Sequence, residues 1–228
     1  MEKYQVIYED NHLIAVSKAP SVLVQGDQTG DTPLSELVRE YIRKKYKKPG
    51  NVFCGVIHRI DRPVSGLVIL ARTSKGLERM TKLFANREVT KTYWAVVSNR
   101  PPQDEEELRH WILKDREKNR VHCLSKEKNG AKEAVLNYKT LGKVGKDYLL
   151  EVTPHTGRPH QIRAQLAKIG CPIRGDLKYG SKNKFDNGKA IMLHSRQLAF
   201  EHPVKKEHTR IEATVPSHDD WQKFKHLG

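Results

Sequence analysis

The sequence predicts a globular protein built from both helices and strands, and three observations support this. The chain has 228 residues, of which 37% are hydrophobic and 30% are charged, a balance typical of a folded protein. Apolar residues alternate over several short runs, as in strands, and recur elsewhere at helical spacing. Proline and glycine mark the ends of many of these runs. A chain of this length can enclose one substantial core or two small ones.

Each element is expected from the pattern of its own segment. Strands are indicated by alternation and β-branched residues, and helices by apolar residues at i, i+3 and i+4 behind a capping residue. In chain order we expect two strands within 4–18 around a turn at 9–11, a strand at 22–25, a helix at 33–48, strands at 56–60 and 67–71, a helix at 74–87, a strand at 91–97, a hairpin of 111–113 with 121–124, strands at 134–138 and 148–152, and a helix at 160–169.

The three expected helices have recognisable ends. Thr32 is the expected N-cap of the first helix, with Pro33 at the first helical position, where a missing N–H costs nothing. Thr73 or Ser74 is expected to cap the second helix. Gly170 follows the third helix and is suited to the backbone conformation that ends helices.

The charge balance points to a polyanionic partner. The chain has 42 Lys and Arg against 27 Asp and Glu, a formal net charge of +15, and nucleic acid is the commonest partner of such a protein. Residues 43–48, at the end of the first expected helix, form the densest basic run. These cations either complement the negative end of the helix dipole or contact phosphate directly. The sequence leaves both interpretations open.

Composition excludes several other classes of protein. The apolar runs are far shorter than the ~20 residues needed to span a bilayer, and the first residues lack the apolar core of a signal peptide. Cys54, Cys123 and Cys171 are widely spaced, so we expect reduced thiols in a cytoplasmic protein rather than a cysteine-rich zinc site. No His-x-x-x-His pair is present, and no metal site is expected.

The strongest candidate for chemistry lies between two β-branched runs, 56–60 and 67–71. These runs predict strands, and the Pro and Gly between them predict a tight connection. Asp61 is therefore expected where a strand ends, with Arg59 and Arg62 on either side. An opposite charge within a few Å favours the ionised carboxylate, which can serve as a nucleophile or a base. The alternative is an aspartate that only shapes its own turn.

A second chemical stretch lies at the start of the last expected helix. Gly157 and Pro159 lead into this helix, and His160 and Arg163 share one of its faces because they are three residues apart. An arginine behind such a turn can meet an anion. A solvated surface arginine is the alternative.

Three motifs resemble those of the RluA-type RNA pseudouridine synthases. Residues 58–66, His-Arg-Ile-Asp-Arg-Pro-Val-Ser-Gly, resemble the signature usually written His-Arg-Leu-Asp-x-x-Thr-Ser-Gly, with Val64 in place of threonine. Residues 91–93, Lys-Thr-Tyr, are similar to the family's Lys-x-Tyr motif. Residues 156–163 are similar to its Thr-Gly-Arg-x-His-Gln-Ile-Arg motif.

Further segments extend the resemblance over nearly the whole chain. Residues 175–180 and 193–203 resemble other family elements, and residues 10–20 resemble its amino-terminal Asp-to-Lys-Pro pattern, with Ala19 before the proline. Gln165 stands where many members have histidine. Because the motifs occur in the family order, they are far more specific together than singly.

The resemblance implies an α+β fold. This is the family's pseudouridine synthase catalytic domain, a mainly antiparallel mixed sheet flanked by helices, with an RNA-binding cleft across it. The resemblance implies a single such domain over residues 1–228, without the small amino-terminal RNA-binding module that many relatives carry. The expected partner is a stem-loop of ribosomal or transfer RNA, and we expect a monomer without a membrane partner.

The resemblance also implies residue roles. The signature aspartate is catalytic in the family and maps onto Asp61; the last arginine of the later motif pairs with it and maps onto Arg163; the tyrosine that stacks on the target base maps onto Tyr93. The reaction breaks the bond between sugar and uracil, turns the base and rejoins it through carbon, so no cofactor is required. The expected substrate-binding residues are His58, Arg59, Arg62, His160 and Leu193.

Two other classes of function are weighed against this one. A non-catalytic RNA-binding protein would share the basic charge but would gain nothing from a carboxylate facing phosphates. A metal-dependent nuclease would need a cluster of carboxylates, which the sequence lacks. In the enzyme hypothesis a paired uridine must first leave its stack, and Arg59 is the candidate to fill the space.

Overall fold

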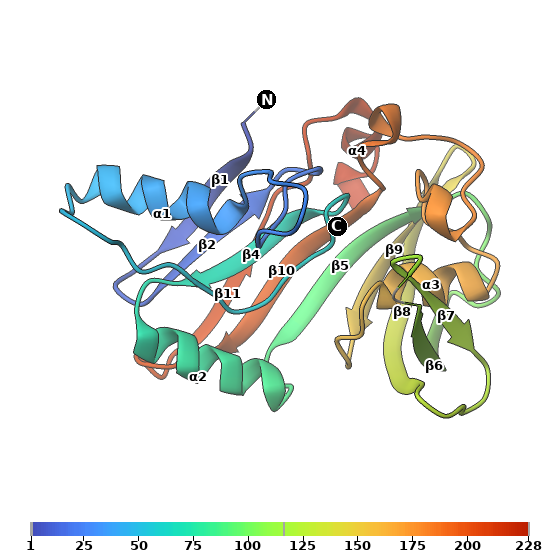
Figure 1. The fold of residues 1–228 in the computed structure, drawn as a ribbon. Helices are drawn as coiled ribbons and strands as arrows, with labels where there is room; N and C mark the ends of the chain where they lie inside the picture. Colours follow the sequence, from blue (N-terminus) through green and yellow to red (C-terminus); the bar gives the residue numbers. More distant parts are fainter. Residues whose placement is uncertain (1, 116, 228) are drawn as a thin grey trace. The chain divides into compact units, whose positions relative to one another are not determined.

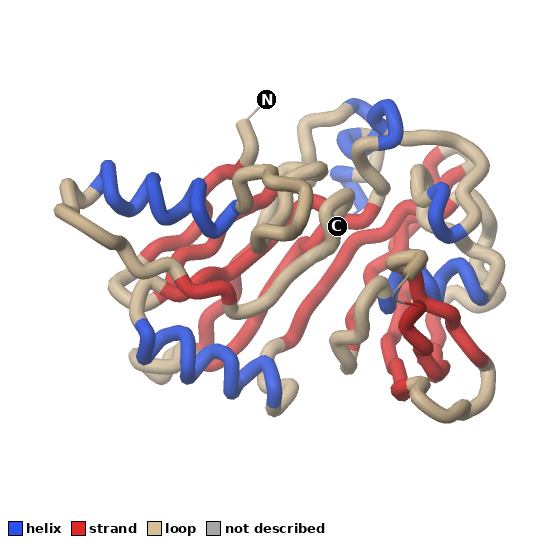
Figure 2. The backbone as a smooth tube through the Cα atoms, viewed as in Figure 1, coloured by secondary structure: helices blue, strands red, loops and turns tan. Residues whose placement is uncertain are grey.

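The computed structural model describes residues 2–115 and 117–227, and the chain divides into two compact units. The first unit combines the chain up to Thr90 with Ser195–Thr214, and the second unit contains the remainder. Each unit is thus assembled from two separate stretches of sequence. Strands and helices occur in both (Figure 2). The expectation of a single catalytic domain stays a prediction.

The first unit is built on a sheet whose strands come from both stretches. Its strand order is β1 (Tyr4–Glu9), β2 (Leu13–Lys18), β4 (Ser65–Ala71) and β10 (Leu193–Glu201), with β3 (Gly55–Val56) beside β4 and β11 (His208–Glu212) beside β10. Asp10 forms the expected turn between β1 and β2, because its Oδ1 accepts from the backbone N–H groups of His12 and Leu13, both at 2.8 Å.

Two helices complete the first unit, α1 (Leu34–Lys45) and α2 (Ser74–Ala85). α1 lies along β1 (Figure 1), where the Tyr4 hydroxyl donates to the carbonyl oxygen of Leu37 at 3.3 Å. α2 begins as predicted, since the Thr73 hydroxyl accepts from the N–H of Gly76 at 3.0 Å.

The start of α1 differs from the expectation. Pro33, not Thr32, occupies the N-cap position, and no side chain caps the helix. The strand expected at 22–25 is also wrong. Both differences have one cause: the first two N–H groups of the helix donate to the carbonyl oxygens of Leu23 at 2.7 Å and Val24 at 3.2 Å. The 22–25 backbone therefore satisfies N–H groups that no residue within the helix can satisfy.

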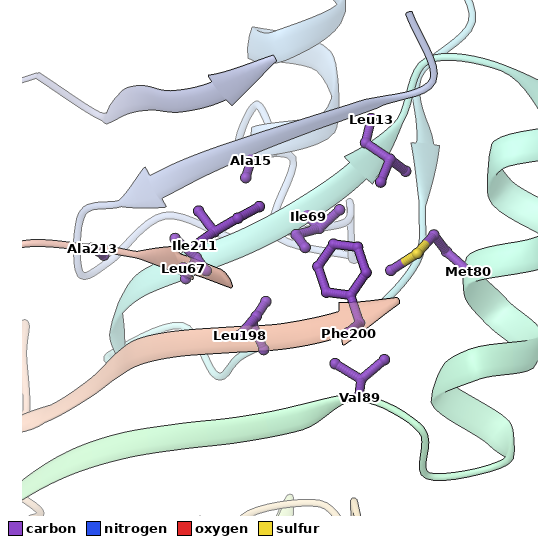
Figure 3. Packing of buried hydrophobic residues seen from close by; sticks show 10 residues of the cluster. All are labelled: Leu13, Ala15, Leu67, Ile69, Met80, Val89, Leu198, Phe200, Ile211 and Ala213. Carbon is purple, nitrogen blue, oxygen red and sulfur yellow. The ribbon is translucent and has the colours of Figure 1, made fainter. Parts of the chain in front are cut away.

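Ten buried residues form one hydrophobic cluster in the core of the first unit (Figure 3). Leu13 and Ala15 of β2 and Leu67 and Ile69 of β4 occupy alternate positions, so they project from one face of the sheet. Met80 of α2 packs against that face. The full set is Leu13, Ala15, Leu67, Ile69, Met80, Val89, Leu198, Phe200, Ile211 and Ala213.

The second unit contains an antiparallel sheet and several short helices. Its strand order is β5 (Thr90–Val97), β9 (Asp147–Pro154), β8 (Lys132–Val144), β6 (Glu105–Asp115) and β7 (Arg120–Leu124), and its helices are α3 (Gln161–Lys168), η1 (Leu177–Tyr179), η2 (Asp186–Gly188), α4 (Asp219–Gln222) and η3 (Lys225–Leu227). The hairpin predicted from 111–113 and 121–124 is confirmed, with Trp111 opposite Leu124. Residue 116, in its connection, lies outside the described residues.

Several strands differ in length from the prediction: β8 and β9 are longer than the expected 134–138 and 148–152. β6 begins at Glu105, well before 111, because it pairs with β8 from the Glu105–Lys139 register onward. In contrast, β3 covers only Gly55–Val56, so that of the expected strand 56–60 only Val56 pairs with β4. His58 explains the early end, since its Nε2 accepts from the backbone N–H of Ile69 at 3.0 Å, in place of a carbonyl. In the part of the chain that the structure describes, none of the helices has the length and apolar character that a membrane crossing requires.

Candidate active site

Asp61 lies in the loop that joins β3 to β4 in the first unit and is half-buried. Its backbone carbonyl oxygen accepts from the N–H of Val64 at 3.0 Å, which closes a turn. The signature ends at Gly66, which has φ +105°. A Cβ at this position would lie 2.3 Å from the carbonyl oxygen of Ser195. Only glycine allows this close approach of two strands, so the signature Gly fixes where the loop meets the sheet.

A buried lysine fixes the same loop. Lys18, the last residue of β2, is 1% exposed, and its Nζ donates to the carbonyl oxygens of Ala19 at 2.9 Å and Arg62 at 3.2 Å. Burial lowers the pKa of Lys18 to about 7, and the negative charge of Asp61 opposes this shift. Lys18 was part of the amino-terminal motif but had no predicted role. The sequence signal that could have found it is a lysine two residues after the apolar run 13–16. In the structure that run is fully buried.

The two arginines beside Asp61 contact the preceding loop. The exposed Arg62 donates from Nη2 to Asp31 Oδ2 at 2.5 Å, and Arg59, also exposed, donates from Nη1 to Gln25 Oε1 at 3.3 Å. These contacts tie residues 25–31 to the loop that carries Asp61. Contact of either arginine with a substrate stays a prediction.

His58 has a clear structural role. In addition to its bond with the N–H of Ile69, its ring stacks on Phe84 of α2, with centroids 4.7 Å apart and planes at 16°. Because Nε2 accepts a hydrogen bond, this nitrogen carries no proton. His58 thus joins β4 to α2, and its predicted substrate contact remains untested.

In the second unit, Arg163 is buried on α3 and paired with Asp176. Its Nε donates to Asp176 Oδ2 at 2.7 Å and its Nη2 to Oδ1 at 2.9 Å, while the two residues are 5% and 1% exposed. Two parallel charge-assisted bonds fix the guanidinium plane. The solvated-arginine alternative is therefore wrong. Asp176 was missed as a site residue, although the 175–180 motif that contains it was recognised.

Tyr179, three residues after Asp176, adds a second contact. The Arg163 guanidinium lies 5.0 Å from the centre of the Tyr179 ring. Burial raises the pKa of Tyr179, so its hydroxyl keeps its proton at neutral pH. That hydroxyl accepts from the N–H of Val121 at 3.0 Å and lies 2.8 Å from His160 Nδ1. The hydroxyl proton can therefore be donated to His160. This residue precedes α3 and has φ 50°.

The turn before α3 is held by Gln161. Its Oε1 accepts from the Thr156 hydroxyl at 2.7 Å and from the N–H of Arg158 at 3.0 Å, and its Nε2 donates to the carbonyl oxygen of Val135 at 3.0 Å. Gln165, which stands where many family members have histidine, is fully buried and donates to backbone carbonyls of β6 and β8. These two amides attach the motif to the sheet.

Two predicted site residues lie on strands. Tyr93, half-buried on β5, is opposite Val152 of β9. Leu193 begins β10 and is 3% exposed. Asp61 belongs to the first unit, whereas Tyr93 and Arg163 belong to the second. The expectation that these three line one cleft stays a prediction.

Other candidate groups have structural partners. Within residues 43–48, Arg43 binds Glu40 at 2.8 Å and Lys45 binds Glu9 at 2.7 Å, as expected of a helix end whose cations serve the fold. Among residues 2–115 and 117–227, no three His, Cys, Asp or Glu gather as metal ligands would. All three cysteines are free thiols.

Comparisons with known proteins identify the family. The family model described as RNA pseudouridylate synthase matches residues 12–168. The chain is 30% identical to the tRNA pseudouridine synthase C of Vibrio parahaemolyticus, over 96% of this chain and 93% of that protein. It is also 30% identical to the ribosomal large subunit pseudouridine synthase C of Rickettsia conorii, over 92% of this chain and 68% of that protein.

Solved structures show the same fold. The human RNA pseudouridylate synthase domain containing 4 matches with a TM-score of 0.80 and 21% identity, over 97% of this chain and 92% of that one. The human domain containing 1 matches with a TM-score of 0.69 and 22% identity, over 94% and 84%. The predicted α+β fold and the RluA-type resemblance are both confirmed. The chain belongs to the RNA pseudouridylate synthase family, and it is an isomerase that forms pseudouridine in RNA.

Proposed function

We propose that Asp61 is the catalytic carboxylate of this enzyme and that its substrate is a uridine in ribosomal or transfer RNA. One relative is named for transfer RNA and another for the ribosomal large subunit, and each is 30% identical to the chain, so the proposal includes both kinds of RNA. Asp61 acts as a nucleophile or as a base while the uracil leaves the sugar.

The observation that carries this proposal is the way in which Asp61 is held. The residue lies within the family match at 12–168, in a turn whose backbone is bonded to the buried Lys18. A fixed backbone limits the positions that the carboxylate can take, and a well-placed carboxylate can attack or remove a proton.

Arg163 and Tyr93 complete the proposed site. Arg163 is the proposed partner of the Asp61 carboxylate, as the family resemblance implies; at ~4 Å and an effective dielectric near 20, two opposite unit charges interact by ~4 kcal/mol. Desolvation offsets part of this energy, so orientation of the carboxylate is the main contribution. Tyr93 stacks on the uracil and holds it while it turns.

The target base leaves its stack to react. An enzyme cannot reach the reacting atoms of a uridine that is stacked and paired in a duplex, and flipping the nucleotide costs a few kcal/mol. In this proposal Arg59, which is exposed and two residues before Asp61, fills the vacated space or clamps the flipped nucleotide. The net charge of +15 supplies phosphate contacts that do not depend on sequence. The enzyme is expected to act as a monomer in the cytoplasm.

The test is to map pseudouridine in total RNA from cells with the gene, without it, and with the Asp61→Asn variant in its place. We expect one or more sites to lose pseudouridine in both altered strains. A site that stays modified in the Asp61→Asn strain but not in the deletion strain would refute the role of Asp61. Whether these sites fall in ribosomal or transfer RNA decides the substrate.

A further inference from the structure

We infer that Asp176 and Tyr179 are positioning residues for Arg163, and that strand β7 takes part in this positioning through Tyr179. The inference rests on the role of Arg163 in the proposed function. It concerns a carboxylate and a phenol that act through the arginine rather than on the RNA.

Asp176 determines how the Arg163 guanidinium is turned. The side chains are 6% and 1% exposed, and the pair uses the N–H of Nε and one N–H of Nη2, out of five donors on the group. A long side chain held at two points loses the rotations that would otherwise redirect its remaining edge. The direction of the Nη1 edge is thus set by the Asp176 carboxylate.

The turn that carries Asp176 is itself fixed. The N–H of Asp176 donates to the carbonyl oxygen of Ile173 at 2.9 Å, and the Asp176 carbonyl oxygen accepts from Ser181 at 3.0 Å. Just before it, Arg174 binds Asp147 at 3.1 Å and Asp220 at 2.7 Å. A carboxylate on such a turn can transmit a fixed position to its partner.

Tyr179 covers the guanidinium and links it to β7. Its ring centre lies 5.0 Å from Arg163 Cζ and 5.2 Å from Arg120 Cζ, both within the range of cation–π attraction. Its hydroxyl accepts from the N–H of Val121, the residue after Arg120. Lys178 adds a bond from Nζ to the carbonyl oxygen of Asn119 at 3.0 Å. One ring therefore joins a buried arginine to an exposed arginine at the end of the β6–β7 hairpin.

The first test is a double-mutant cycle of Asp176→Asn and Arg163→Lys. Single-turnover rates of tritium release are measured on [5-³H]uridine-labelled RNA from cells lacking the gene, with filter binding of the same RNA. We expect Asp176→Asn to slow the reaction by about 10–100-fold, the effect of misplacing a catalytic group by ~1 Å, at nearly unchanged affinity. In the Arg163→Lys background the same substitution should add little, because coupled residues are not additive.

Several results would overturn the inference. Multiplicative rate losses in the double variant would mean that Asp176 acts independently of Arg163. A wild-type rate for Asp176→Asn would mean that it does not act at all. Where Asp176→Asn fails to fold, Asp176→Glu gives the same test, because it keeps the charge but displaces the carboxylate. It should be slow while binding RNA normally, and a wild-type rate for it would also overturn the inference.

A comparison of Tyr179→Phe with Tyr179→Leu isolates the ring. Both variants lack the hydroxyl, but only phenylalanine keeps an aromatic face against the guanidinium. We expect Tyr179→Leu to be about tenfold slower than Tyr179→Phe at equal RNA affinity, a difference that misplacement of Arg163 can produce. Equal rates for the two variants would show that the aromatic ring of Tyr179 does not position Arg163.

The proposed function and this inference fail in different ways. An active Asp61→Asn enzyme, or a fast Arg163→Lys enzyme, contradicts the proposed function itself. A slow Arg163→Lys enzyme together with a fast Asp176→Asn enzyme contradicts only the inference drawn here.

Discussion

Lys18 Nζ lies 3.2 Å from the carbonyl oxygen of Arg62, the residue directly after Asp61. A lysine that is 1% exposed thus holds the loop that carries the proposed catalytic carboxylate. Burial of this amine has a measurable consequence for the pH dependence of stability, because its pKa falls to about 7 from a usual value of 10.5.

The first prediction follows from that shift. Between pH 7 and pH 10.5 the unfolded chain binds the Lys18 proton more tightly than the folded chain does, so this group makes the free energy of unfolding rise with pH across that window. Lys18→Met removes this contribution. We therefore expect the stability advantage of the wild type over Lys18→Met to grow from pH 7 to pH 10 in urea unfolding. The exposed Lys75→Met is the control, and its difference from wild type should stay flat.

The second prediction separates chemistry from RNA binding. Asp61→Asn keeps the size of the side chain but removes its charge, and a neutral amide cannot act as a nucleophile or base. Tritium release from uridine-labelled RNA should fall below detection while RNA affinity stays within about threefold, or rises slightly because a negative charge has gone. Near-normal turnover would refute the mechanism, and loss of both properties would indicate misfolding.

The third prediction concerns Arg163→Lys. Lysine keeps the charge but lacks the planar fork that binds Asp176 at two points. Turnover should be lower than in the wild type and higher than in Asp61→Asn. Circular dichroism and RNA binding, measured on the same samples, should match the wild type; a changed spectrum would attribute the loss to folding.

The fourth prediction addresses the basic run at the end of α1. Because Lys45 forms an ion pair with Glu9, the exposed Lys47 and Lys48 are the residues to test for RNA contact. Reversing both charges should flatten the log–log salt dependence of RNA affinity by roughly 0.7–0.9 for each phosphate that is no longer neutralised. Lys75→Glu with Lys82→Glu on α2 makes the same change of charge elsewhere. If both double variants keep the wild-type slope, the basic run does not contact RNA and only complements the negative end of the α1 dipole.

The fifth prediction tests the signature glycine. An alanine Cβ at Gly66 would lie 2.3 Å from the Ser195 carbonyl oxygen, at φ +105°. Clash and backbone strain together should destabilise the first unit by about 2–4 kcal/mol. Gly30 also has a positive φ, of +76°, but nothing lies within 4 Å of an added Cβ. Gly30→Ala should therefore show the strain alone, and equal destabilisation by both substitutions would show that the close approach to Ser195 is unimportant.

Local pattern by itself determined much of this protein. The turn at Asp10, a helix start capped by Thr73 or Ser74 and the strand β5 were all predicted, because each depends on residues only a few positions apart. The motifs around residues 58–66 and 156–163 also sufficed to indicate the family, since their residue types and order are specific.

Tertiary structure alone decided the rest, because long-range partners leave no local pattern. Nothing near Thr32 in sequence shows that Leu23 and Val24 carbonyls cap α1, and the early start of β6 depends on its pairing with β8. The same holds for the proposed site. Asp176 is 13 residues from Arg163, and Lys18 is 44 residues from Arg62, so both contacts arise only when the chain folds and burial makes an unpaired charge costly.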